Sequence, residues 1–367
     1  MNHRRLVDTR ALTGLRFLAA FHVLLLHELP DQIDGATEIE NILLERTAAL
    51  SVFFVLSGLL ISIGTGNKNW TKSRARSFLV RRVAKTVPLY YIALLLFLPI
   101  FIYRTIYIYD SSLEKGILAV LINIFNFQSF FPHIPEPWYI NRPSWTIGVF
   151  LTCYLTFPLI HNYLITCTSE KLIYYFVFFY VMSQTIVLVL EARLDIYSTE
   201  LEIIHKFPFI RIFEFYMGVS IGTWIVVREK SLTISHKLVL PTSIIILLLF
   251  IFLPKQFDNY IHNGLLTPLF IILFLSSSSG KDKILNFLRN GPIYSLGVAS
   301  YSFYILHLVI ANYLSAMIIL INGSSIRFSP EFIVINLLFV IPISRYVYDN
   351  YEEPWRKKII SHYSAKE

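Results

Sequence analysis

The chain has 367 residues, of which 55% are hydrophobic, 16% aromatic and only 15% charged. This composition, with a mean hydropathy of +0.59, excludes an ordinary soluble domain and indicates a bundle of membrane helices. The net charge is +8, but the basic residues lie between apolar segments and form no separate basic domain, which argues against nucleic-acid binding.

The first apolar run, residues 11–29, is long enough to cross a bilayer and contains Arg16 and His27. Eleven residues are about three helical turns, so the two side chains share one face and lie about 16 Å apart along the axis. Ionisable residues inside a membrane are costly and indicate a functional site. The alternative is that Arg16 reaches the inner interface and His27 lies at the outer one. His22 lies on another face of this helix and is not part of the predicted site.

Nine further apolar runs follow without a soluble insert, so we expect one integral-membrane domain over residues 1–367. We predict an all-α, polytopic bundle with about ten spans, at 11–29, 47–64, 86–103, 143–165, 171–190, 207–227, 238–254, 264–279, 296–321 and 332–348. A shorter run at 116–131 contains two Asn and one Gln, and we expect it to be re-entrant or interfacial.

The charges of the loops predict how this bundle is oriented in the membrane. The segment between the first two spans is acidic, whereas residues 65–85 carry seven basic residues and no acidic one. The positive-inside rule therefore predicts that residues 65–85 and both termini are cytoplasmic. Arg16 then lies toward the cytoplasm and His27 toward the exterior.

A basic cluster, Arg81, Arg82 and Lys85, stands at the start of the third span. Arginine forks match phosphate oxygens, so the cluster is a candidate site for a cytoplasmic phosphate ligand. The alternative is ordinary orientation charge attracted to anionic lipid. In the second span, Ser57 and Gly58 indicate close helix packing.

Polar groups in the later spans form a second set of candidates. Arg211 and Glu214 are three residues apart, which allows a structural ion pair. His307 lies on one face with two tyrosines, either as a packing residue or as part of a site. Aromatic residues near the fourth span suit an interfacial anchor or a sugar-stacking surface. We retain as candidate substrate-binding residues Trp145, Arg211, Glu214, Tyr301 and His307. The two cysteines lack metal-ligand spacing, and no metal site is expected.

An intramembrane histidine can act as a general base or relay protons in a transporter, and the residues alone do not choose between these functions. The chain also resembles the membrane-bound acyltransferase 3 family of bacterial integral-membrane O-acyltransferases. The resemblance rests on seven blocks in order: LTGLR (12–16) with His27, SVFFVLSG (51–58), RRVAKTVPLY (81–90), PSWT (143–146), RIFEFYMG (211–218), LGVASYSFYILH (296–307) and YEEP (351–354).

The resemblance implies a ten-helix enzyme of the bacterial inner (cytoplasmic) membrane. Such an enzyme moves an acyl group, usually acetyl, from cytoplasmic acyl-CoA to a hydroxyl of a cell-surface glycan or glycolipid. By resemblance, His27 is the base or transient acyl carrier and Arg16 helps to position the donor. Arg81, Arg82 and Lys85 contact the phosphates of coenzyme A, and no permanently bound cofactor is expected.

The sequence departs from the family pattern at Phe150. Many members carry a glutamate a few residues after the block that ends here at Thr146, whereas this chain has Gly148, Val149 and Phe150. Phenylalanine neither transfers protons nor pairs with arginine. The rival hypothesis is a non-enzymatic exporter of a glycan intermediate, which would use the same residues as a proton and anion path.

Overall fold

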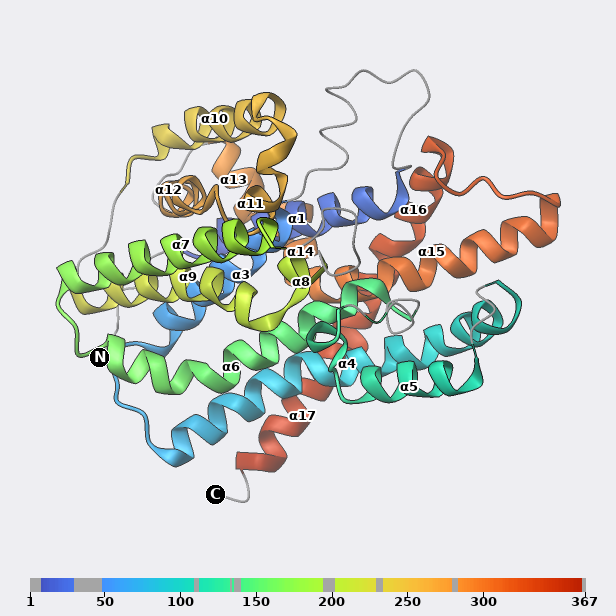
Figure 1. The fold of residues 1–367 in the computed structure, drawn as a ribbon, viewed down its shortest axis with the longest axis horizontal. Helices are drawn as coiled ribbons and strands as arrows, with labels where there is room; N and C mark the ends of the chain where they lie inside the picture. Colours follow the sequence, from blue (N-terminus) through green and yellow to red (C-terminus); the bar gives the residue numbers. More distant parts are fainter. Residues whose placement is uncertain are drawn as a thin grey trace.

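The computed structural model describes residues 8–29, 48–108, 112–132, 134, 140–193, 202–228, 234–278 and 283–364, and within these ranges every regular element is a helix (Figure 1). The α-helices are α1 Arg10–Glu28, α3 Ala49–Thr65, α4 Lys72–Tyr107, α5 Leu113–Ile124, α6 Trp145–Leu164, α7 Ser169–Glu191, α8 Glu202–Lys206, α9 Pro208–Arg228, α10 Val239–Phe252, α11 Asp258–His262, α12 Thr267–Ser277, α13 Lys283–Arg289, α14 Gly291–Val298, α15 Ser300–Asn322, α16 Pro330–Val347 and α17 Glu353–Ser364. Shorter turns are η1 Gln128–Phe130, η3 Arg142–Ser144, η5 His236–Leu238 and η6 Lys255–Phe257, and η7 Tyr348–Glu352 is π-helical. The predicted all-α class is confirmed.

Seven helical segments of the described chain are long and apolar enough to cross a membrane: Arg10–Glu28, Lys72–Tyr107, Arg142–Leu164, Ser169–Glu191, Glu202–Arg228, Ser300–Asn322 and Pro330–Ser364. A bent pair, His236–Phe252 with Lys255–His262, turns by 119° and raises the number to eight if it is one span. The protein is therefore a multi-pass membrane protein, but the predicted count of about ten is not confirmed. The two remaining apolar helices, α3 and α12, have 17 and 11 residues.

The segment between α10 and α12 explains why α12 is so short. Helix α10 ends just before Pro254, and α12 begins at Thr267 with a proline in its first turn. Between them Gly264 has φ +91°, a conformation that residues with a side chain rarely adopt. The apolar run that predicts a span at 264–279 therefore begins in an unwound segment and becomes helical only from Thr267 onward.

The shorter apolar run at 116–131 forms α5, whose 12 residues do not reach across a bilayer. Two tyrosines of α4 cap its last carbonyls: the Tyr90 hydroxyl donates to Asn123 O, and the Tyr91 hydroxyl donates to Ile124 O at 2.8 Å. The expectation that this run does not span agrees with the structure. Its re-entrant or interfacial position stays a prediction.

Helices α3 and α9 approach each other closely in the middle of the bundle. A Cβ atom added at Gly58 would lie 2.0 Å from Phe215 O, and one added at Gly218 would lie 2.0 Å from Val55 O. Beside this contact, the hydroxyls of Ser62 and Thr223 share a hydrogen bond of 2.7 Å. The close packing predicted for Gly58 is confirmed. This contact fixes α3 as one wall of the candidate site.

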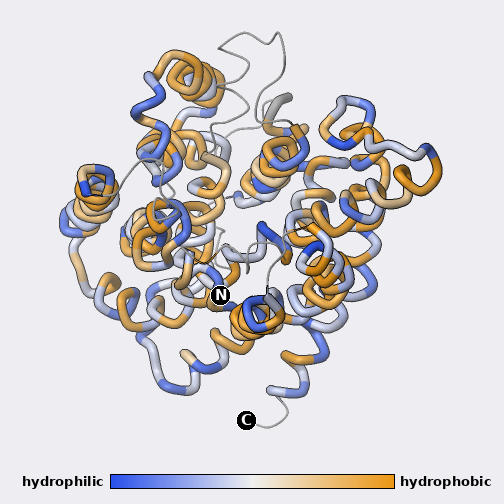
Figure 2. Tube along the Cα trace, turned by 45° about the vertical axis from the view of Figure 1, so that its right-hand side comes forward, coloured by the Kyte–Doolittle hydropathy of each residue, from blue (hydrophilic) through white to orange (hydrophobic). Residues whose placement is uncertain are grey.

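The outer faces of the bundle are apolar. Leu95 on α4, Leu159 on α6 and Leu320 on α15 are 66%, 77% and 86% exposed, and Figure 2 shows hydrophobic residues along the helices throughout the fold. Exposed leucines on several helices suit contact with lipid. The basic start of α4 lies at the same end of the bundle as the start of α7 and the end of α9, at the left of Figure 1.

Candidate active site

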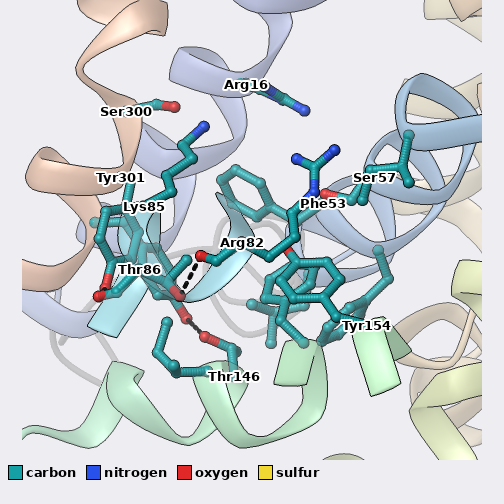
Figure 3. A pocket seen from close by; sticks show the side chains of 16 residues that line it. Arg16, Phe53, Ser57, Arg82, Lys85, Thr86, Thr146, Tyr154, Ser300 and Tyr301 are labelled. Carbon is teal, nitrogen blue, oxygen red and sulfur yellow. Dashed lines mark hydrogen bonds between the residues drawn. The ribbon is translucent and has the colours of Figure 1, made fainter. Parts of the chain in front are cut away.

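A cavity of about 100 Å³ lies between α1, α3, α4, α6 and the start of α15 (Figure 3). It is lined by Arg16, Leu50, Phe53, Phe54, Ser57, Ile61, Arg82, Lys85, Thr86, Thr146, Ile147, Phe150, Tyr154, Ser300, Tyr301 and Tyr304. Five of the seven sequence blocks contribute to this lining. Residues far apart in the chain therefore meet at one place.

Three cations gather on one side of the cavity. The charged ends of Arg16, Arg82 and Lys85 point toward one another, opposite Thr146 (Figure 3). The Arg82 guanidinium lies over the Tyr154 ring at 5.7 Å, and its Nε atom is buried without a hydrogen-bond partner among the described residues. Arg81, by contrast, is exposed and does not line the cavity. The structure thus joins Arg16 to two members of the predicted basic cluster and leaves the third outside.

Glu352 of the π-helical turn supplies a carboxylate next to these cations. It is 5% exposed, accepts a hydrogen bond of 2.5 Å from Ser302 Oγ and interacts electrostatically with Lys85. The π-helical turn inserts one residue into the last helix, which is a frequent feature of functional sites. Sequence reasoning assigned Glu352 no role, although it belongs to the YEEP block.

Six aromatic side chains also line the cavity. The Phe150 ring packs against Phe54 at a centroid distance of 4.8 Å and against Tyr154 at 5.9 Å. Tyr301 lines the same cavity, and its hydroxyl donates to Thr86 O at 2.5 Å. Phe150, the position where a glutamate is common in the family pattern, therefore makes the wall apolar rather than charged.

His27 and His307 form a pair next to the cavity. His27 Nδ1 lies 2.9 Å from His307 Nε2, and His307 Nδ1 lies 2.6 Å from Tyr304 O. Tyr304 lines the cavity, and its hydroxyl donates to Pro143 O at 3.0 Å. His307 is one helical turn after Tyr304 on α15, so the histidine pair lies just outside the cavity. The sequence did not predict this contact, because 280 residues separate the two histidines.

A further polar cluster follows at the end of α1. Glu28 is fully buried, and its carboxylate accepts a hydrogen bond of 3.2 Å from Arg327. Arg327 and Arg104 both donate to Asn312 Oδ1, at 2.8 and 2.5 Å. The sequence analysis assigned Glu28 no role in the site, although its position directly after His27 was a signal that it belongs to this region.

Arg211 and Glu214 make a fully buried ion pair of 2.8 Å, which agrees with the structural alternative. Arg211 also donates to His262 O at 2.5 Å and to Asn263 Oδ1 at 2.9 Å, in the unwound segment before α12. Neither residue lines the cavity, although Arg211 lies over the ring of Phe54. The Arg211–Glu214 ion pair therefore lies outside the cavity, and Phe54 is between Arg211 and the cavity.

Side chains from two other helices bind the same unwound segment. Ser51 donates to His262 O at 2.8 Å, and Ser183 and Gln184 donate to Asn263 O at 2.8 and 2.9 Å. Inside a membrane, carbonyls outside a helix need such partners. These contacts indicate a structural function for the ion pair.

The aromatic candidates Tyr301 and Trp145 differ, because Tyr301 lines the cavity and Trp145 does not. Trp145 is 6% exposed in the core around α6 and does not line the cavity. Its aromatic neighbours at 138–139 lie outside the described residues. Among the described residues, no group of three or more His, Cys, Asp and Glu side chains is arranged to hold a metal ion.

The comparison with known protein families decides the class of this protein. Residues 9–345 match the family described as an acyltransferase domain, Acyl_transf_3. The chain belongs to this acyltransferase family. The family resemblance stated above is thereby confirmed, and the matched range includes six of the seven blocks, all except YEEP.

A curated relative is named an acyltransferase. The chain is 32% identical over 163 residues to acyltransferase MdmB from Streptomyces mycarofaciens, a match that covers 42% of this chain and 40% of MdmB. No solved structure matches the chain.

Proposed function

We propose that this acyltransferase moves a short acyl group, acetyl, from cytoplasmic acyl-CoA to a hydroxyl of a cell-surface glycan or glycolipid. The observation that supports this most is the joint placement of Arg16, Arg82 and Lys85 in one cavity, next to the His27–His307 pair. On the predicted orientation, the cations face the cytoplasm and the histidines the exterior of the bacterial inner membrane.

The cations suit a donor that carries phosphates. Cations within a membrane protein cost free energy unless an anion compensates them. No acidic side chain forms an ion pair with Arg16 or Arg82 among the described residues, and Arg82 Nε lacks a hydrogen-bond acceptor. Phosphate groups supply both charge and acceptors, and guanidinium forks bind them well. Arg81 does not line the cavity, so we assign it only to donor phosphates that lie outside the cavity.

The histidine pair suits the chemical step. In the proposed reaction the acceptor hydroxyl oxygen attacks the thioester carbonyl while His27 takes the hydroxyl proton. The new C–O ester bond forms, the C–S bond breaks, and the thiolate of coenzyme A leaves and takes up the proton from His27, which returns to its neutral form. A variant of this scheme transfers the acyl group to His27 first. The small volume of the cavity, about 100 Å³, favours a short acyl group.

The test uses membrane vesicles that contain the full chain, labelled acetyl-CoA and isolated cell-envelope glycan. Wild-type vesicles are expected to label the glycan, and His27→Ala is expected to lower the rate by about 10²–10⁴-fold. Arg82→Ala removes charge-assisted hydrogen bonds and is expected to raise KM for the donor by roughly 10–100-fold. Lys72→Ala, an exposed cation earlier on α4, is the matched control and is expected to leave KM unchanged.

Two results would refute the proposal. A His27→Ala protein that labels glycan at the wild-type rate would exclude His27 as base and as acyl carrier. Glycan export that continues in the wild type without any use of acyl-CoA would favour the exporter instead.

A further inference from the structure

The partners of His307 determine which of its nitrogens carries a proton. Nδ1 lies 2.6 Å from Tyr304 O, and a backbone carbonyl can only accept a hydrogen bond. Nδ1 of His307 therefore carries the hydrogen. The imidazole is fully buried, and its two partners are a carbonyl and another imidazole rather than a carboxylate. A buried charge without a compensating partner is costly, so His307 is neutral and its Nε2 is unprotonated.

This assignment fixes the protons of His27. His307 Nε2 has a lone pair and no hydrogen, so it accepts from His27 Nδ1, 2.9 Å away. Neutral His27 then carries its hydrogen on Nδ1 and a lone pair on Nε2. The nitrogen that faces away from His307 is thus the one able to take a proton from an acceptor hydroxyl.

The ring geometry supports a true hydrogen bond between the two histidines. Their planes differ by only 13°, and their centroids are 5.2 Å apart. With a nitrogen–nitrogen distance of 2.9 Å, these values place the rings edge to edge. The lone pair of an imidazole nitrogen lies in the plane of its ring. The edge-to-edge arrangement places His27 Nδ1, the donor, in line with the lone pair of His307 Nε2. A face-to-face stack would not align the two nitrogens.

The surrounding chain holds this arrangement in place. The backbone of α15 fixes Tyr304 O, and Asn141 Nδ2 donates to Ile305 O at 2.9 Å in the same turn. On the other side, Glu28 follows His27 in α1 and binds Arg327. Neither Glu28 nor Arg327 forms a hydrogen bond with either imidazole among the described contacts. The proton arrangement of the pair therefore depends on Tyr304 O and on the two rings themselves.

We infer that His307 is a positioning residue that holds His27 with Nδ1 protonated and Nε2 free to act as the base. It takes the place that a carboxylate takes in the Ser-His-Asp arrangement, but as a neutral acceptor. When His27 binds the proton of the acceptor, the Nδ1–H bond to His307 persists and keeps the ring oriented. This inference rests on the proposed function, because it assigns His27 as the base.

Three substitutions of His307 separate this role from simple packing. The amide oxygen of Gln reaches the place of Nε2 and accepts the His27 hydrogen, so His307→Gln is expected to keep kcat within about 10-fold of wild type. Asn is polar but ends near the place of Nδ1, and Leu accepts nothing. His307→Asn and His307→Leu are expected to lower kcat by about 10²–10⁴-fold, the usual range for a lost general base. KM for acetyl-CoA is expected to stay unchanged in all three, because the donor cations are untouched.

The assay is the glycan-labelling reaction in vesicles, with thermal unfolding of each variant to confirm folding. His22→Leu is the matched control, since His22 lies half-buried in the same span as His27 but outside the pair, and wild-type kcat is expected. Two results would overturn the role of His307: wild-type kcat in His307→Leu beside an inactive His27→Ala, or an equal loss in folded His307→Gln and His307→Asn. An active His27→Ala would instead overturn the proposed function itself, so the two failures are distinguishable.

Discussion

At the scale of single residues, Phe150 limits the size of the cavity in which we propose that the acyl group binds. Its ring closes one wall of the cavity against Phe54 and Tyr154. We expect Phe150→Ala to enlarge the cavity, so that the ratio of kcat/KM for butyryl-CoA to that for acetyl-CoA rises at least 10-fold. Acetyl transfer is expected to fall, because the donor loses contacts. The measurement is a series of acyl-CoA chain lengths with the vesicle assay.

The control for this prediction is Leu155→Ala on the same helix. Leu155 is 63% exposed on the outside of α6, so its truncation leaves the cavity intact and the chain-length preference unchanged. An unaltered preference in Phe150→Ala would show that the acyl group lies elsewhere.

The spacing of residues along single helices predicted part of the candidate site. Arg16 and His27 share one face of a helix because eleven residues are about three turns. Spacing alone places Arg81 and Lys85 one turn apart and Arg82 on the adjacent face, whereas the structure brings Arg82 and Lys85 to the cavity and leaves Arg81 exposed. Spacing did not predict Glu352 next to Lys85 or Arg327 bound to Glu28. These partners come from distant spans, and only tertiary packing brings them together.

At the scale of helices, the contact of α3 with α9 depends on the absence of side chains. Because Cβ at Gly218 would lie 2.0 Å from Val55 O, we expect Gly218→Ala to push the helices apart. Overpacking of this kind costs about 1–3 kcal/mol or more. The expected result is a lower unfolding temperature in detergent and, because α3 lines the cavity, a lower rate of acyl transfer.

Gly64 on α3 is the matched control, since a Cβ there meets nothing within 4 Å. Gly64→Ala is expected to leave the unfolding temperature unchanged or to raise it, because alanine favours a helix over glycine by about 1 kcal/mol. Equal losses in the two variants would contradict the packing argument.

The unwound segment before α12 depends on the Arg211–Glu214 pair. Glu214→Ala leaves the fully buried Arg211 without its carboxylate, which typically costs roughly 3–5 kcal/mol. We expect a large fall in the unfolding temperature while KM for acetyl-CoA in the folded fraction stays at the wild-type value. A raised KM with normal stability would instead support the substrate-binding role predicted from the sequence. The thermal scan and the donor titration decide between these outcomes.

At the scale of the whole molecule, hydropathy located the apolar segments but did not determine how many cross the membrane. Each of the ten predicted spans overlaps a helix, yet α12 is shortened by the unwound residues around Gly264, and α10 continues into a bend of 119°. Such breaks require side chains from other helices, including Ser183 and Gln184, to bind the freed carbonyls. A pattern of apolar residues does not contain that information.

The loop charges predict the orientation of the bundle in the membrane, and this prediction is testable. The basic start of α4 and the turn between α15 and α16 lie at opposite ends of the fold (Figure 1). By the positive-inside rule, Lys72→Cys is expected to be labelled by a membrane-impermeant thiol reagent only after cells are opened, and Ser324→Cys in intact cells. The native Cys153 and Cys167 are buried and give little background. Reversed labelling would place the donor cations outside the cell, where acyl-CoA is absent, and would refute both the orientation and the proposed donor.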